Sequence, residues 1–379
     1  MKNFEYYNPT KIVFGKNTID RIGNEIKGFG LRKVLLIAGG GSIKTNGVYD
    51  QVVRSLDRTE IERVEAWDVQ ANPMLSKVRE MITLAKKSGV EGILAVGGGS
   101  VIDSGKSVAA GVYSGDIWAL FEKRFVNVPA LPLFTVLTIS ASGSEFDPFA
   151  VITNEDEEKK WLLGCRSLFP KVSIIDPSVQ VTLPWNQVVN GAVDAITHIM
   201  EAYVTAEDAE VTLALDESLM RSIVAMTDRL QKNKEDYNAR ASLAWATSLA
   251  LSGVQSAGLN VGDFSCHGIE HGISAINPKI AHGAGLSVVV PAWIDYCHHV
   301  KPGLFKRWAR NVWNVESAKM GVAIFREKIR SWGNPTTLLE LGIEVDQIPA
   351  IAANTVESGL TGLVKVLSEE DIRAILLST

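Results

Sequence analysis

Apolar residues follow two different patterns in the two halves of the chain. In the first half, short continuous apolar runs end in glycine or serine, as at 34–39, 91–100 and 133–140, and stretches of helical period lie between them. Such runs are typical of strands buried on both faces of a parallel sheet that helices cover. The same reading predicts further strands at 61–67 and 171–177 and helices at 46–56 and 75–89.

The pattern changes close to residue 182, and helical periodicity then continues to the end of the chain. The segments 217–233, 240–253 and 322–333 each repeat apolar residues at the spacing of one helix face. We therefore predict an α/β domain over residues 1–180 and an all-helical domain over residues 181–379. No low-complexity linker or internal repeat separates the two.

Composition narrows the classes of partner and compartment. The 379 residues carry a formal net charge of −5, which does not favour nucleic acid or an anionic membrane as a partner. No apolar run approaches the roughly 20 residues of a membrane span. The three cysteines, Cys165, Cys266 and Cys297, form no disulfide framework and no CxxC pair. These features predict a soluble, cytoplasmic protein.

Two glycine-rich segments follow predicted strands and precede predicted helices. They are Gly39–Ser42 and Gly97–Ser100, both of sequence GGGS. Glycine lets backbone N–H groups approach a phosphate closely, and the start of a helix favours an anion. Either copy alone is equally well explained as a tight turn. Two copies at strand ends of one sheet instead predict a bound dinucleotide, and a third small, hydroxyl-rich segment follows at 138–145.

The residues around these loops suggest a choice of cofactor. The second loop continues to Asp103 and Lys106, which would otherwise be a helix-dipole partner and a surface charge. The first loop offers no carboxylate to a ribose 2′-hydroxyl, and Lys44 lies two residues beyond Ser42. Because a cation suits a 2′-phosphate, we expect NADP(H) to be preferred over NAD(H).

Histidines are concentrated in the helical half. Asp194 and His198 are four residues apart, as are His267 and His271, and His282 follows. Four-residue spacing places two side chains on one face of a helix, one turn apart. A single helical histidine is most often structural, but a carboxylate with several imidazoles predicts a site for a first-row divalent metal.

These segments together resemble the iron-containing (group III) alcohol dehydrogenases, over essentially the whole chain. The resemblance is carried by NPTKIVFG (8–15), GGGSIKTNGVYDQV (39–52), GGGSVIDSGK (97–106), TISASGSE (138–145), DAxxHxxE (194–201) and CHGIEHGISA (266–275) followed by HGAGL (282–286). The branch that the chain looks most like contains NADPH-dependent butanol dehydrogenases and aldehyde reductases. The resemblance implies a Rossmann-like dinucleotide domain joined to an all-helical metal domain, as in dehydroquinate synthase.

The resemblance also implies a role for each residue of the site. Fe²⁺ is the expected metal, with Zn²⁺ as an alternative, and its implied ligands are Asp194, His198, His267 and His282. His271 would lie near the nicotinamide as a catalytic residue that relays a proton. Cys266 is read as packing. The implied cofactor-binding residues are Gly40, Gly41, Ser42, Asn72, Gly98, Gly99, Ser100, Asp103, Thr138, Ser142 and Lys160.

The implied reaction is hydride transfer between NADP(H) and a primary alcohol or aldehyde such as butanol or butyraldehyde. An NAD-dependent polyol dehydrogenase and a dehydroquinate-synthase-like lyase on the same fold stay open as alternatives, as does a non-catalytic binding protein. Trp245, Leu259 and Phe264 are candidates for the substrate pocket, although ordinary helix packing is the more common explanation for each residue taken alone. A homodimer is expected from the family.

Overall fold

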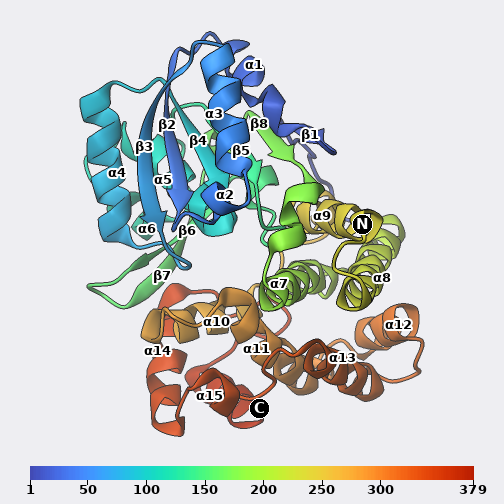
Figure 1. Ribbon diagram of the computed structural model, residues 1–379. Coiled ribbons are helices and arrows are strands. Elements are labelled where there is room, and N and C mark those ends of the chain that lie inside the picture. The colour runs from blue at the N-terminus through green and yellow to red at the C-terminus, as the bar shows by residue number, and fades with distance from the viewer. The chain divides into compact units, whose positions relative to one another are not determined.

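The computed structural model describes residues 1–379 and divides the chain into two compact units. One unit spans residues 8–183, and the other combines residues 184–379 with residues 1–7. Figure 1 shows the sheet of the first unit and the helices of the second. None of the helices is both long enough and apolar enough to serve as a membrane span.

A six-stranded parallel sheet forms the centre of the first unit, in the order β1-β8-β5-β4-β2-β3. The carboxyl ends of all six strands therefore lie at the same edge of the sheet. The continuous apolar runs had predicted this parallel arrangement. The strands are β1 (Lys11–Phe14), β2 (Lys33–Gly39), β3 (Glu62–Val69), β4 (Gly92–Gly97), β5 (Leu133–Leu137) and β8 (Val172–Ile175).

Helices cover both faces of this sheet because alternate strand residues point to opposite sides. Leu94 and Val96 of β4 belong to the core that includes Ile22 of α1 and Val52 of α3. The alternate face of β4 packs on α5, where a Cβ on Gly105 would lie 3.2 Å from the Cβ of Ala95. The helices are α1 (Ile22–Lys27), α2 (Ser42–Thr45), α3 (Val48–Arg58), α4 (Leu75–Ser88), α5 (Gly99–Gly111) and α6 (Trp118–Lys123).

An antiparallel hairpin, which the sequence analysis did not predict, follows β5. Its strands are β6 (Phe149–Asn154) and β7 (Lys159–Gly164). The backbone N–H of Thr153 donates to the carbonyl of Pro73 at 2.8 Å. The hairpin is thereby joined to the segment that follows β3.

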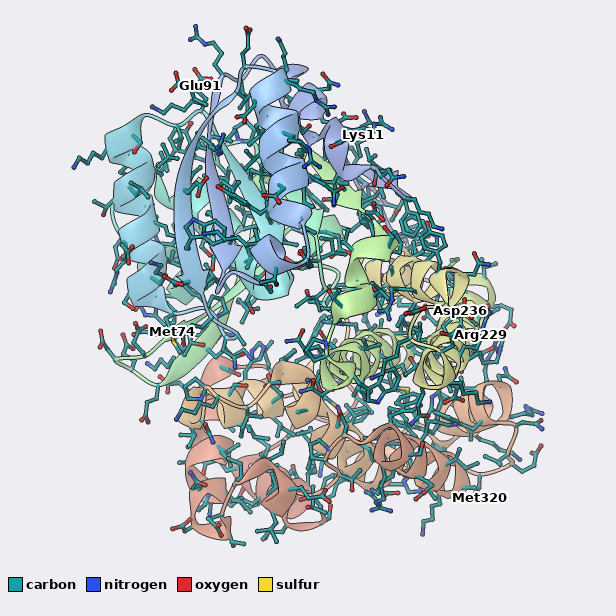
Figure 2. The ribbon with its side chains drawn as sticks, viewed as in Figure 1. Lys11, Met74, Glu91, Arg229, Asp236 and Met320 are labelled. Atoms are coloured by element: carbon teal, nitrogen blue, oxygen red, sulfur yellow. The ribbon has the colours of Figure 1, made fainter.

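The second unit is helical, as predicted. Within it, the turn between α8 and α9 is closed by an ion pair of 2.6 Å between Arg229 and Asp236 (Figure 2). The helices are α7 (Trp185–Tyr203), α8 (Glu210–Lys232), α9 (Tyr237–Leu249), α10 (Ser265–Ile276), α11 (His282–Cys297), α12 (Pro302–Trp313), α13 (Ala318–Trp332), α14 (Ile348–Ser358) and α15 (Glu369–Leu377).

The first residues of the chain pack on this helical unit, at the loop between α9 and α10. The backbone N–H of Lys2 donates to the carbonyl of Gly258 at 2.9 Å, and its Nζ donates to Asn260 Oδ1 at 2.5 Å. A Cβ on Gly258 would lie 2.6 Å from the side chain of Met1, so the two segments are in close contact. The predicted fold class, an α/β unit joined to a helical unit, is confirmed.

Candidate functional site

Three helices of the helical unit bring the predicted acidic and histidine residues together. Asp194 and His198 lie one turn apart on α7, His267 and His271 lie one turn apart on α10, and His282 begins α11. The first four are buried, and the side chain of His282 is 26% exposed. A cluster of polar side chains has therefore been removed from water, which costs free energy unless each of them has a partner.

One carboxylate oxygen lies at the centre of the cluster. Asp194 Oδ1 is 3.3 Å from His198 Nδ1, 3.5 Å from His267 Nε2 and 3.7 Å from His282 Nε2. Asp194 Oδ1, His198 Nδ1 and His267 Nε2 are buried without a hydrogen-bond partner. Buried polar atoms are seldom left so. A divalent cation among them would satisfy all three, so the donor set fits a metal.

His271 does not group with Asp194 as His267, the other histidine of α10, does, because its donor atoms group with those of Glu270 and His282. Its ring centroid is 5.6 Å from that of His282 and 6.4 Å from that of His267. The donor atoms of Asp194, His267 and His282 form one compact group, and those of Glu270, His271 and His282 form another. The ring of His198 lies 4.3 Å from that of His267. The assignment of His271 outside the ligand set stays a prediction.

Two buried glutamates, to which the sequence analysis gave no role, hold the histidine rings. Glu201 accepts a hydrogen bond from Nδ1 of His267, and Glu270 accepts one from Nδ1 of His282. Both glutamates are fully buried. A carboxylate behind an imidazole fixes the ring so that its other nitrogen points at a metal. The spacing was the available signal, because Glu201 lies two helical turns beyond Asp194.

Near pH 7, Asp194 and His198 are in the protonation states that bind a metal, whereas His267 is not. Burial opposes ionisation of Asp194, but the surrounding histidines outweigh it and lower its pKa to about 2. Burial and the neighbouring His267 lower the pKa of His198 to about 3, so its ring is neutral near pH 7. Burial also disfavours the charged form of His267, yet the Glu201 and Asp194 carboxylates raise its pKa to about 10. Metal binding at Nε2 therefore requires His267 to lose a proton.

Cys266 does not join the donor group. Its side chain is fully buried, and burial together with the Glu201 carboxylate raises the pKa of the thiol well above its usual range. A metal would need the thiolate form. The structure is in keeping with the interpretation of Cys266 as a packing residue.

In the α/β unit, the two glycine-rich segments lie at the carboxyl edge of the parallel sheet. The first follows β2, and Gly41 there adopts a left-handed φ of 102°. The second follows β4 and leads into α5. A Cβ on Gly99 would lie 2.5 Å from Ser142 Oγ, so a side chain at this position would displace the Ser142 side chain of the loop after β5. Thr138 donates its backbone N–H to the Gly97 carbonyl at 3.0 Å.

The remaining predicted cofactor residues lie near the same edge. Asn72 is buried with φ of 54° and directly precedes Pro73, whose carbonyl accepts from Thr153. Thr153 is the register partner of Lys160 in the hairpin, so the hairpin brings Lys160 towards the segment after β3. The α/β unit thus gathers residues from five separate segments. Their contact with a cofactor stays a prediction.

Asp103 and Lys106 take part in a buried network. Lys106 is fully buried, and its Nζ donates to Asp147 Oδ1 at 2.7 Å, to Ser144 Oγ at 2.9 Å and to the Phe149 carbonyl at 2.6 Å. The alternative view of Lys106 as a surface charge is therefore wrong. Asp103 accepts from Ser144 Oγ at 2.6 Å, and burial raises the pKa of Asp103 to about 6. This network ties the loop between β5 and β6 to α5.

Lys44, the predicted phosphate partner, lies over an aromatic ring. Its Nζ is 3.9 Å from the centre of the Trp67 ring and 5.6 Å from that of Tyr49. Asp68, to which no sequence motif gave a role, is exposed and has φ of 69°. It lies at the end of β3, where Val69 pairs with Gly39. A carboxylate at the strand next to the first glycine loop is the usual partner of an NAD ribose.

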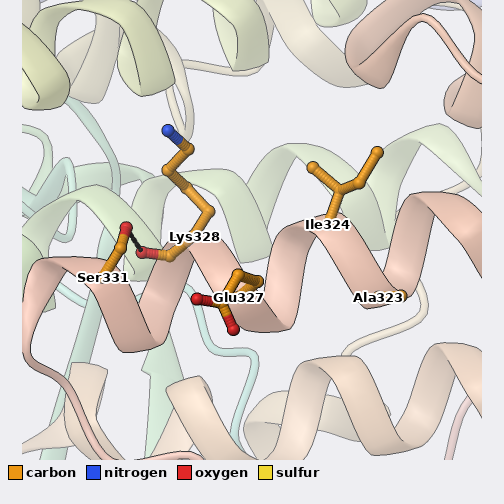
Figure 3. A pocket seen from close by; sticks show the side chains of 5 residues that line it. All are labelled: Ala323, Ile324, Glu327, Lys328 and Ser331. Carbon is orange, nitrogen blue, oxygen red and sulfur yellow. Dashed lines mark hydrogen bonds between the residues drawn. The ribbon is translucent and has the colours of Figure 1, made fainter.

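Two cavities accompany these features. One of about 260 Å³ lies in the α/β unit, between Asp68 at the end of β3, Gln70, Pro73 and Met74 before α4, and Ser104 of α5. Another hollow of about 470 Å³ lies along α13 of the helical unit, beside Ala323, Ile324 and Lys328 (Figure 3). None of the predicted site residues lines the hollow on α13.

Comparison with known protein families covers both units. Residues 9–177 match the family model described as iron-containing alcohol dehydrogenase, and residues 188–379 match the C-terminal model of the same family. The chain belongs to the iron-containing alcohol dehydrogenase family. Membership implies a nicotinamide cofactor and a divalent metal, confirms the resemblance and argues against the lyase alternative. This protein is thus an iron-type alcohol dehydrogenase.

Individual relatives within the iron-containing alcohol dehydrogenases differ in their named cofactor. NADH-dependent butanol dehydrogenase A of Clostridium acetobutylicum is 37% identical, over 99% of both chains. NADPH-dependent aldehyde reductase YqhD of Escherichia coli is 32% identical, over 96% of this chain and 95% of that protein. The crystal structure of NADH-dependent butanol dehydrogenase A from Thermotoga maritima has a TM-score of 0.97 and 47% identity, covering 100% of this chain and 98% of that one.

Proposed function

We propose that this iron-type alcohol dehydrogenase interconverts primary aldehydes and alcohols of about the size of butyraldehyde and butanol, using NADP(H). The observation that carries the proposal is the set of three unpartnered buried donor atoms, Asp194 Oδ1, His198 Nδ1 and His267 Nε2. We assign Asp194, His198, His267 and His282 as metal ligands, with Fe²⁺ as the expected metal. The cofactor-binding residues are those predicted from the resemblance, at the carboxyl edge of the sheet.

A bound divalent ion would supply Lewis acidity towards the alcohol or aldehyde oxygen, and the nicotinamide would supply or accept the hydride. The chain's own contribution is orientation. Glu201 and Glu270 hold the His267 and His282 rings, and the burial of Asp194 keeps water away from its carboxylate. The buried Lys106 network fixes the loop that carries Thr138 and Ser142.

Metal removal tests this function. We expect the purified protein to oxidise NADPH when butyraldehyde is added, and a chelator to reduce that rate to background because Lewis-acid assistance is lost. Re-addition of Fe²⁺ should restore the rate, and Zn²⁺ added in parallel tests the alternative metal. The measurement is the loss of NADPH absorbance. Full activity in chelated, metal-free protein would contradict the proposal.

We assign His271 as the residue that moves a proton between substrate and water. It lies beside His282 without belonging to the Asp194 group, and an imidazole titrates in the useful range of pH. His271→Gln is expected to lower kcat by about 10²–10⁴-fold and to remove one limb of its pH profile, while metal content stays unchanged. An unaltered pH–rate profile in this variant would discard the role.

The preference for NADP(H) rests on the first glycine loop. That loop contains no carboxylate, and Lys44 is held over Trp67 near the edge of the sheet. The NADH-dependent relatives and the exposed Asp68 favour NAD(H) instead. We base the preference for NADP(H) on Lys44, because a cation held at the loop offsets the charge of a 2′-phosphate.

Lys44→Ala tests this preference directly. We expect KM for NADPH to rise about tenfold, as for the loss of one charged hydrogen bond, and KM for NADH to change little. Asp68→Asn is the matched variant, which should weaken NADH binding if that carboxylate binds the ribose. A wild-type kcat/KM that favours NADH would refute the preference for NADP(H).

We also propose a homodimer in the cytoplasm. β1 is an edge strand of the sheet, and edge strands are ready to pair with another chain. Sedimentation of the purified protein as a monomer at micromolar concentration would contradict the dimer.

A further inference from the structure

The residue that begins α10 has an unusual backbone conformation. Phe264 has φ of 55° and ψ of 13°, in the left-handed region, at the N-cap of the helix that carries His267. A bulky residue seldom adopts this conformation because its Cβ crowds the backbone, and such outliers concentrate at functional sites. Glycine or asparagine would make the same turn at lower cost. The phenyl ring, rather than the turn, is therefore the distinctive feature of this position.

The preceding residue fixes this conformation. Asp263 Oδ2 accepts the backbone N–H groups of Leu363 and Val364, both at 2.7 Å, and Asp263 Oδ1 accepts that of Ser265 at 3.3 Å. The backbone N–H of Asp263 donates to the Glu201 carbonyl at 2.8 Å. Because Asp263 is buried and held on three sides, the strained residue beside it cannot relax.

The ring of Phe264 lies at the edge of the donor cluster. Its centroid is 5.9 Å from that of His267, with the ring planes at 68°. The ring also lies against Gly262, where a Cβ would be 2.7 Å from it. Phe264 is half-buried within the helical unit, so the ring presents an apolar surface next to a histidine of the cluster.

We propose that Phe264 is a specificity-determining residue that limits the bulk of the substrate close to its reacting carbon. This inference rests on the proposed function. A rigid aromatic wall beside His267 leaves room for an unbranched chain and excludes branching at the carbon next to the carbonyl. Apolar pockets discriminate by about 10–200-fold for one methyl or methylene group, so the effect is measurable.

The test compares two aldehydes across variants of opposite size. Butanal and 2,2-dimethylpropanal are reduced with NADPH, and the ratio of their kcat/KM values is the readout. Phe264→Ala is expected to shift the ratio at least tenfold towards the branched aldehyde, chiefly by lowering its KM. Phe264→Trp is expected to shift the ratio the other way. Val261→Ala is the matched control, since Val261 is 82% exposed in the same loop, and should leave the ratio unchanged.

Metal content and thermal unfolding of each variant separate specificity from damage. Phe264→Asn suits the left-handed backbone and removes the ring, so it replaces the alanine variant if that one does not fold. The inference is overturned if the alanine or asparagine variant keeps its metal but loses activity equally towards both aldehydes. If the metal-loaded wild type reduces neither aldehyde, the proposed function fails before any variant is made.

Discussion

Replacing His267 with alanine is expected to leave the purified protein without metal and to lower aldehyde reduction by at least about 10³-fold. The reason is that His267 Nε2 is one of three unpartnered buried donor atoms, together with Asp194 Oδ1 and His198 Nδ1. Losing the metal removes several kcal/mol of charge stabilisation, and each 1.36 kcal/mol corresponds to a factor of ten in rate. Elemental analysis gives the metal per chain, and NADPH absorbance gives the rate.

His299→Ala is the matched control for this variant, because His299 is exposed and lies two residues beyond the end of α11. It should keep its metal and its activity. Thermal unfolding of both proteins shows whether the His267 variant is folded. If folded His267→Ala protein retains stoichiometric metal and wild-type turnover, the assignment of this residue as a ligand is wrong.

Replacing Lys106 with methionine is expected to have the largest effect on stability, a loss of about 3–5 kcal/mol in the free energy of unfolding. Lys106 and Asp147 form an ion pair of 2.7 Å in which both side chains are almost fully buried. Burial already raises the pKa of Asp147, and Lys106 opposes that rise. Without Lys106 the carboxyl is left buried without its cation. Urea unfolding measures the loss.

A double-mutant cycle separates the ion pair from simple packing. Asp147→Asn added to Lys106→Met removes the uncompensated charge, so the double variant should be more stable than the sum of the single losses predicts. Additivity within about 0.5 kcal/mol would contradict coupling of the pair. Lys87→Met, at an exposed position of α4, should change stability by no more than about 0.5 kcal/mol.

The Lys106 variant should also raise KM for the cofactor, because the loop carrying Ser142 loses its anchor.

The sequence predicted the fold best where successive residues of a strand are all buried. The apolar run at 34–39 became β2, and glycine stops marked the ends of β2 and β4. The β6–β7 hairpin was missed because seven polar residues, 154–160, occupy its centre and conceal two short apolar runs. Its position depends on the contact of Thr153 with Pro73, some 80 residues earlier, which no local pattern encodes.

The site was accessible only in part. Helical spacing identified the pairs on α7 and α10, but it placed His267 and His271 on one face and could not separate their roles. The structure groups His267 with His282, from another helix, around Asp194. The roles of Glu201 and Glu270 could not be predicted because each role depends on a histidine partner. Glu201 meets His267, and Glu270 meets His282, only in the folded chain.

The packing of Lys2 on Gly258 and Asn260 bears on how the protein should be produced. Gly258 and Asn260 lie in the loop that leads to Phe264 and His267. The first two residues of the chain therefore contact the loop that precedes α10. A purification tag fused to the N-terminus would lie next to this contact. A tag after Thr379 avoids it, and that arrangement is the appropriate one for metal analysis and substrate profiling.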